Sequence, residues 1–158
     1  MKKVIFKSIV FFLLLLPLNC GFKVVDKSKL NKFSIKEISI SGDKRINFKI
    51  KNNLIIDTGK KNEKLLLIDL NTRKIKTIKE KNIKNEITKY QISLNVEIKF
   101  NLIDSVKEYQ SSLAVSGDYL VADSYSTTLT NEKRLIGYLI EDISEKILNN
   151  INSKLNDI

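Results

Sequence analysis

The sequence predicts a two-layer α+β sandwich, in which an about four-stranded, largely antiparallel sheet carries two amphipathic helices on one face. The expected element order is β-α-β-β-β-α. Two patterns support this class. Apolar and polar residues alternate without a break over residues 90–102, which is typical of a strand with one buried face. Apolar residues then recur at helical spacing over residues 128–155, which predicts a long amphipathic helix.

The first strand is expected at residues 33–40. Phe33 and Ile35, then Ile38 and Ile40, lie among polar residues, and the alternation slips by one place at residues 36–37. Such a slip indicates a β-bulge. Gly42 and Asp43 follow as a turn.

Residues 44–57 fit two periods. Ile46, Phe48 and Ile50 alternate as in a strand, whereas Ile46, Ile50 and Leu54 are spaced by four as on a helix face. Asp43 is a suitable helix N-cap and Gly59 lies where a helix could end. Periodicity alone leaves both alternatives open, and we expect a helix, partly from a resemblance described below.

Three antiparallel strands and a helix complete the domain. Leucine and isoleucine residues predict a strand over residues 65–78, followed by a polar turn at 79–85. After the alternating strand at 90–102, residues 109–121 form the last strand, where Gly117 suggests a bulge. On the final helix, one apolar stripe is expected to pack on the sheet; its central members are Ile140, Ile143 and Ile147.

The N-terminus has the order of parts found in a secretory signal peptide. Lysines at positions 2, 3 and 7 precede an apolar run at residues 9–16, Pro17 ends that run, and Cys20 follows. The run is far shorter than the ~20 residues that a spanning helix needs. We therefore expect a signal peptide at residues 1–19, a lipidated tether at 20–32 and one domain at 33–158.

The segment Leu16–Cys20 resembles a lipobox, the recognition sequence for lipid modification of a cysteine, although Pro17 and Asn19 depart from its common form. Acyl chains such as palmitate on Cys20 would anchor the chain to a membrane, since each buried CH₂ contributes ~0.8 kcal/mol. Gly21 stands where an Asp would retain a lipoprotein at the inner membrane, so the outer membrane is the expected location.

The positive net charge of the chain indicates an anionic partner, although codon bias is an alternative explanation. The net charge is +10, and the three lysines of the signal peptide leave about +7 on the remainder. Acidic lipid, lipopolysaccharide and nucleic acid would all fit, and export makes nucleic acid the least suitable. Codon bias toward Lys, Asn and Ile accounts for the excess equally well.

Catalytic motifs are missing from the sequence. There is no His, and no metalloprotease, nucleophile-elbow, P-loop or dinucleotide-binding motif occurs. We therefore expect no enzymatic activity, no metal and no cofactor. A hydrolase using carboxylates is the alternative from another class; the acids considered for it are Asp69, Glu97 and Asp118.

Short motifs give the chain a resemblance to the lipopolysaccharide-assembly lipoprotein family LptE, in its alphaproteobacterial form. Cys20-Gly21-Phe22 resembles the mature N-terminus of that family, residues 89–96 resemble its RY-x-L-x-V strand, and residues 123–127 resemble the turn before its last helix. The order of elements agrees over most of residues 20–155. Residues 57–86 contain no motif that aligns.

The resemblance implies a role without bond chemistry. LptE proteins plug the outer-membrane barrel LptD, assist its assembly and bind lipopolysaccharide. Cations at the end of one predicted strand and in its turn are expected to pair with lipid A phosphates; they are Arg73, Lys74, Lys76, Lys79, Lys81 and Lys84. The alternatives are a solvated, codon-biased turn and, for the whole chain, an auxiliary lipoprotein of another envelope lipid-transport system.

Overall fold

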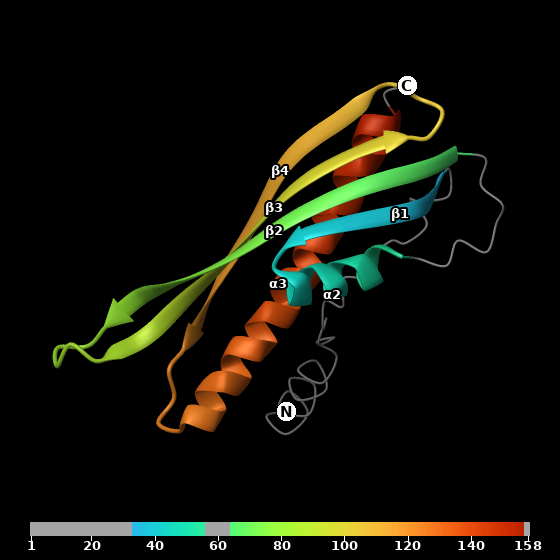
Figure 1. Ribbon diagram of the computed structural model, residues 1–158. Coiled ribbons are helices and arrows are strands. Elements are labelled where there is room, and N and C mark those ends of the chain that lie inside the picture. The colour runs from blue at the N-terminus through green and yellow to red at the C-terminus, as the bar shows by residue number, and fades with distance from the viewer. Residues whose placement is uncertain (1–32, 56–63, 157–158) are drawn as a thin grey trace, which may run out of the picture.

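The computed structural model describes residues 33–55 and 64–156. The elements are β1 (Phe33–Gly42), α2 (Lys44–Leu54), β2 (Lys64–Lys81), β3 (Ile87–Leu102), β4 (Glu108–Leu120) and α3 (Tyr125–Asn156). The sheet order is β1-β2-β3-β4, with β1 parallel to β2 and the other pairs antiparallel (Figure 1). The predicted α+β class and element order are confirmed.

The end of β1 is fixed by a glycine. Gly42 has φ +82°, and a Cβ there would collide with the carbonyl oxygen of Thr72. Glycine allows both this left-handed conformation and this close approach. Asp43 then donates its backbone N–H to the same carbonyl at 2.8 Å. Earlier in the strand, the register with β2 shifts between Ile35 and Glu37, so the predicted bulge is confirmed.

Segment 44–54 is a helix because its start is capped and its four-residue stripe is buried. The Asp43 carboxylate accepts from the N–H groups of Arg45 and Ile46, both at 3.1 Å. Ile46, Ile50 and Leu54 are at most 4% exposed. The predicted helix is therefore confirmed, and its spacing of four outweighs the alternation at residues 46–50.

A buried amide locks α2 to the sheet. Asn47 is fully buried, and its side chain donates to the carbonyl oxygen of Ser41 and accepts from the Thr72 hydroxyl at 2.6 Å. A buried polar group without partners would cost free energy, and here its amide is bonded at both ends. The pair of bonds sets α2 against the ends of β1 and the middle of β2.

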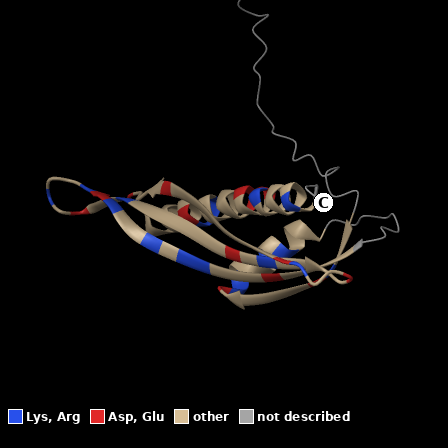
Figure 2. Cartoon of the chain, turned by 90° about the horizontal axis from the view of Figure 1, so that it is seen from above, with Lys and Arg blue, Asp and Glu red and all other residues tan. Residues whose placement is uncertain are grey.

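The core lies between the sheet and the two helices, which occupy one face of it (Figure 2). The alternation predicted for β3 is confirmed, because the five inward residues of its central part are at most 1% exposed, and Tyr90 and Leu102 at its ends are partly buried. The five are Ile92, Leu94, Val96, Ile98 and Phe100. From α3, Ile140, Ile143 and Ile147 are at most 3% exposed and belong to the same core, as predicted.

The turn predicted at residues 79–85 is wrong in its extent. β2 continues to Lys81, and the turn occupies the residues between Lys81 and Ile87. Asn82 closes it, since its side-chain oxygen accepts from the N–H groups of Lys84 at 2.9 Å and Glu86 at 3.0 Å. The lysines at 79 and 81 suggested a polar turn, but pairing with β3 continues to Lys81, with register shifts on either side of Glu80.

Two other expectations require correction. Gly117 forms no bulge, because the β3–β4 register runs unbroken through it. Its role is close packing, since a Cβ would lie 2.6 Å from Cδ1 of Leu135 on α3. The last helix begins at Tyr125 and not at Thr128, because the Ser124 hydroxyl accepts from the Thr127 N–H at 3.0 Å and so caps an earlier turn.

The predicted signal peptide, the lipidation site Cys20, the tether and Gly59 fall outside the described residues. Of the two helices that are described, α2 and α3, neither combines the length and the apolar character needed to cross a membrane.

Candidate functional site

The most strongly charged feature is the distal half of the β2–β3 hairpin, residues 73–89, which we call the basic hairpin. β1 ends opposite Thr72, so from Arg73 onward β2 has a neighbour only on its β3 side. The segment carries seven cations and two carboxylates, a net charge of +5. It projects away from α2 (Figure 1), and Lys and Arg recur along it (Figure 2).

The six cations predicted as a ligand site lie in this hairpin but are divided between its faces. Side chains alternate along β2, so Arg73 and Lys79 point to the outer face whereas Lys74 and Lys76 point toward α3. Lys81 lies at the end of β2 and Lys84 in the turn. From Arg73 to Lys81 the strand spans ~26 Å at ~3.3 Å per residue. One phosphate group cannot contact them all.

The cations differ in how far their charge is compensated. Lys76 lies 2.7 Å from Glu132, and Lys79 lies 4.0 Å from Asp118. Within residues 33–55 and 64–156, the other four have no carboxylate within 4 Å; they are Arg73, Lys74, Lys81 and Lys84. Among the described residues these four form no ion pair, and they are the cations best able to accept an anionic ligand; we call them uncompensated, although Lys74 also acts electrostatically on Glu132.

Lys76 has a different task, because it joins the hairpin to α3. Glu132 accepts from the Lys76 ammonium at 2.7 Å and from the Tyr119 hydroxyl at 2.8 Å. The ammonium also lies 4.3 Å from the ring centre of Tyr90, which stacks on Tyr119 at 5.6 Å. We call these four residues the Lys76 network. They come from β2, β3, β4 and α3, so the network fixes the hairpin against the helix.

The network shifts the pKa values of Glu132 and Lys76 in opposite directions. Burial acts to raise the pKa of Glu132, but hydrogen bonds from Lys76 and Tyr119 outweigh it, and the pKa is lowered. For Lys76, burial acts to lower the pKa and the bond to Glu132 outweighs it, so the pKa is raised. Both groups are therefore held in their charged forms.

Apolar side chains accompany the charges of the basic hairpin. Ile75 is 39% exposed, Ile78 is 52% exposed and Ile83 in the turn is fully exposed. The sequence pattern placed Ile75 and Ile78 in the strand and gave no sign that they lie beyond the core. Exposed isoleucines among uncompensated cations suit an amphiphile with anionic head groups.

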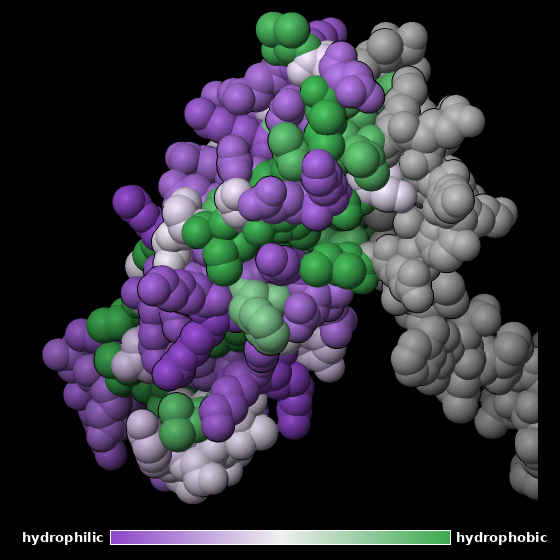
Figure 3. All heavy atoms as spheres, turned by 45° about the vertical axis from the view of Figure 1, so that its right-hand side comes forward, coloured by the Kyte–Doolittle hydropathy of each residue, from purple (hydrophilic) through white to green (hydrophobic). Residues whose placement is uncertain are grey.

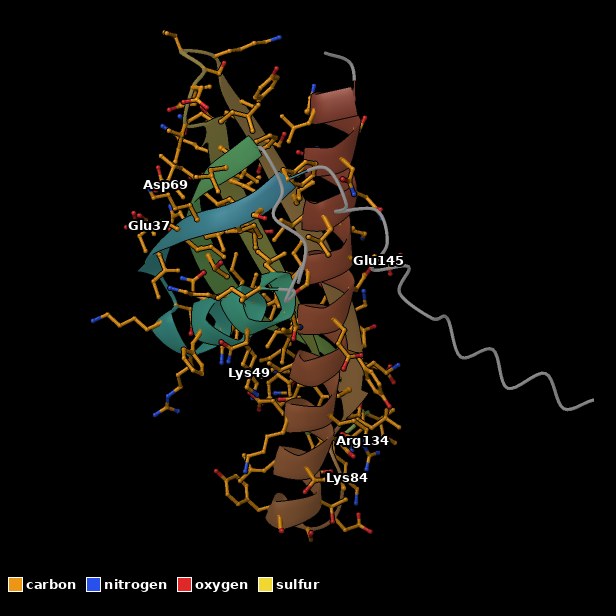
Figure 4. The ribbon with its side chains drawn as sticks, turned by 90° about the vertical axis from the view of Figure 1, so that its right-hand side faces the viewer. Glu37, Lys49, Asp69, Lys84, Arg134 and Glu145 are labelled. Atoms are coloured by element: carbon orange, nitrogen blue, oxygen red, sulfur yellow. The ribbon has the colours of Figure 1, made fainter. Side chains whose placement is uncertain are left out.

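Helix α2 provides a second basic and partly apolar surface. It carries Lys44, Arg45, Lys49 and Lys51 and no carboxylate. Phe48 is also 60% exposed. Lys49 projects from this helix in Figure 4, and hydrophobic and hydrophilic surface alternate on the face shown in Figure 3. Its charge is smaller than that of the basic hairpin, and fewer apolar side chains are exposed on it.

The three carboxylates weighed as a hydrolytic set are not brought together. Asp118 pairs with Gln91, six residues along β3 from Glu97, which corresponds to ~20 Å. Asp69 and Glu97 are diagonal neighbours on the solvent-exposed outer face. Asp69 and Glu37 point away from α3 (Figure 4). Among the described residues, no group of three His, Cys, Asp or Glu side chains could hold a metal ion.

The fold defines the class of protein: a two-layer α+β domain with a long last helix and a projecting, basic hairpin. Two solved structures have a similar fold. Rare lipoprotein B of Shewanella oneidensis matches with a TM-score of 0.58 at 14% identity, over 76% of this chain and 96% of that one. A lipoprotein candidate of Caulobacter crescentus matches with a TM-score of 0.58 at 13% identity, over 82% and 94%. No protein-family model and no curated protein matches the sequence.

Proposed function

We propose that this chain is an outer-membrane lipoprotein of lipopolysaccharide assembly, which binds lipopolysaccharide through the basic hairpin and serves as plug and assembly partner of an LptD barrel. In this role it catalyses no covalent reaction. The observation that carries the proposal is the hairpin, with four uncompensated cations and three exposed isoleucines. The phosphates of lipid A would pair with the cations, and its acyl chains would contact the isoleucines.

Three further points support the envelope setting. The order of charges, apolar run and Cys20 at the N-terminus is that of a lipoprotein precursor. Both similar structures are of proteins described as lipoproteins. The motifs at residues 20–22, 89–96 and 123–127 resemble LptE, as set out above.

Binding of lipopolysaccharide is tested by removing only the uncompensated cations. We expect the variant Arg73→Gln, Lys74→Gln, Lys81→Gln, Lys84→Gln to bind lipopolysaccharide at least about tenfold more weakly at low salt, with an unchanged melting temperature. The parent affinity should fall as salt rises, because exposed charges are screened beyond ~10 Å at 0.1 M. Lys76 is excluded, since its loss would disturb the Lys76 network.

Matched controls separate the site from net charge. A variant of α3 removes one Arg and three Lys as well, at Lys133, Arg134, Lys146 and Lys154, and should keep the parent affinity. A third variant replaces Lys44, Arg45 and Lys49 with Gln. If only that variant lost affinity, the ligand site would lie on α2; equal affinity for the hairpin variant and the parent would remove the hairpin from the site.

A further inference from the structure

The outer edges of the sheet differ in how they are protected against pairing with another strand. An edge strand presents unpaired N–H and C=O groups and is a template for a further strand unless the sequence prevents it. The strand order leaves such edges on β1, on β2 beyond Thr72 and on β4. The first two carry recognisable protection.

At β1 the protection is structural. The bulge at Lys36 interrupts the strand, and two of its carbonyl oxygens accept from α2 side chains: Ile38 from Lys51 at 3.4 Å, and Ser41 from Asn47. At β2 the protection is charge. Five cations occupy residues 73–81, and lysines on an edge disfavour pairing with another chain.

Strand β4 has none of these devices. Its 13 residues contain no Lys, Arg or Pro, and its register with β3 has no irregularity. Along its N-terminal half, no element of the described chain lies beside its outer edge, whereas α3 comes near its C-terminal end (Figure 1). Within the described residues, the only hydrogen bond reaching the β4 backbone from outside the sheet is from Asn131 to the carbonyl oxygen of Leu120, at the strand's end, 3.2 Å long.

We propose that β4 pairs with β4 of a second copy of this chain, antiparallel and centred on Ala114. The strand is complementary to itself in this register. Ala114 faces its own copy, Leu113 faces Val115, and Ser112 faces Ser116. Gln110 faces Asp118, and Glu108 faces Leu120, so no like charges oppose each other. Apolar, hydroxyl and amide–carboxylate pairs across strands each stabilise a sheet.

Side-chain size also favours this register. Ser112, Ala114 and Ser116 are exposed on the face away from the helices and are small, so two copies can approach without steric conflict. A register centred on Leu113 would instead place Glu108 opposite Asp118, which like charges disfavour. Charge therefore disfavours the register centred on Leu113, and the small side chains around Ala114 favour a centre there.

This pairing stops at two copies. A single two-fold axis relates them, so the β4 edge of each copy is occupied by the other. The only sheet edges left exposed are the protected ones of β1 and β2. The axis is perpendicular to the sheet and keeps both helix layers on the same face. The expected product is a dimer with one continuous sheet and not an open fibre. The dimer is a state of the chain outside the barrel, and this inference does not depend on lipopolysaccharide binding.

The dimer is tested first by blocking the edge. In the mature chain, residues 20–158 with Cys20→Ser, sedimentation over a concentration series should show a monomer–dimer equilibrium. Ala114→Lys should raise the dissociation constant of the dimer at least about tenfold, as expected for a lysine on an edge. Thr77→Lys places the same charge on the β2 edge and should leave the dissociation constant of the dimer unchanged. A parent chain that stays monomeric up to ~100 µM, or an Ala114→Lys variant that dimerises like the parent, overturns the proposal.

The register is tested by disulfide formation. In the Cys20→Ser background, Ala114→Cys has the only thiol and faces its own copy, within the 4.4–6.8 Å between Cα atoms that a disulfide needs. It should cross-link on mild oxidation. Ser112→Cys should not, because residues 112 of the two copies lie four residues apart along the strands, ~13 Å. Equal cross-linking of the two variants overturns the register centred on Ala114.

Discussion

At the scale of the residue, Glu132 determines how the basic hairpin is held. It receives hydrogen bonds from Lys76 and Tyr119, two side chains on different strands, and only 17% of its side chain is exposed. No sequence pattern identifies this carboxylate, because Lys76 lies 56 residues away and the two meet only when the twisted hairpin passes over α3. Loss of Glu132 should therefore loosen the hairpin from the helix.

We expect Glu132→Gln to lower the free energy of unfolding by about 1–2 kcal/mol at neutral pH, because hydrogen bonds between charged partners are replaced by neutral ones. Chemical denaturation of the two proteins measures this difference. Glu141→Gln, at an exposed position on α3, is the control and should have almost no effect. A variant as stable as the parent would show that the Lys76 network does not hold the hairpin.

The same variant predicts a pH dependence. The pKa of Glu132 is lowered on folding, so its stabilising effect is complete above the ordinary glutamate value of 4.5 and is lost as pH falls through the lowered pKa. Gln does not titrate. The stability difference between parent and Glu132→Gln should thus stay constant from pH 6 to 8 and shrink in acid. A difference that grew in acid would contradict this assignment.

At the scale of the element, α3 stabilises the domain through its buried stripe. Ile143 is fully buried against the sheet. We expect Ile143→Asp to lower the free energy of unfolding by more than about 3 kcal/mol, since it buries a carboxylate without a partner. Thermal unfolding measures the loss. Asn149→Asp, at an exposed position on the same helix, is the control and should change the melting temperature little.

The regular elements were predictable because their burial follows one period. The alternation in β3 and the apolar stripe of α3 each describe a face that packs on a continuous layer. Helix α2 was ambiguous, since its four-residue stripe overlaps a short alternation, and its cap and the buried Asn47 decide it. The sequence prediction ended β2 too early because its last residues are rich in lysine. Pairing with β3 nevertheless holds them in the strand.

The candidate site was predictable only in part, for the same physical reason. The six cations were visible as a run of charge, but alternation along a strand divides them between two faces, and contacts from distant elements engage Lys76 and Lys79. Ile83 becomes exposed only because the hairpin projects past the core. The assignment of lipopolysaccharide to these residues stays a prediction.

At the scale of the whole molecule, the predicted lipid anchor at Cys20 would decide where the domain acts. We expect Cys20→Ser to abolish incorporation of labelled fatty acid and to leave unprocessed precursor, because the modified thiol is the substrate of lipoprotein processing. Metabolic labelling and the intact mass report on both. Retention at the membrane with an unchanged mass would contradict the lipoprotein proposal, while the domain at residues 33–158 would keep its fold.

The proposed barrel partnership is tested most directly by purification of the chain through a C-terminal tag from membranes of its own host, followed by mass identification of whatever accompanies it. We predict that one large outer-membrane barrel of the LptD family accompanies the chain in a ratio near one to one and survives washing at high salt. The Ile143→Asp variant, with its fold disrupted, should recover none. Recovery of components of another lipid transporter, with no barrel, would contradict the proposal and favour an auxiliary lipoprotein of that system.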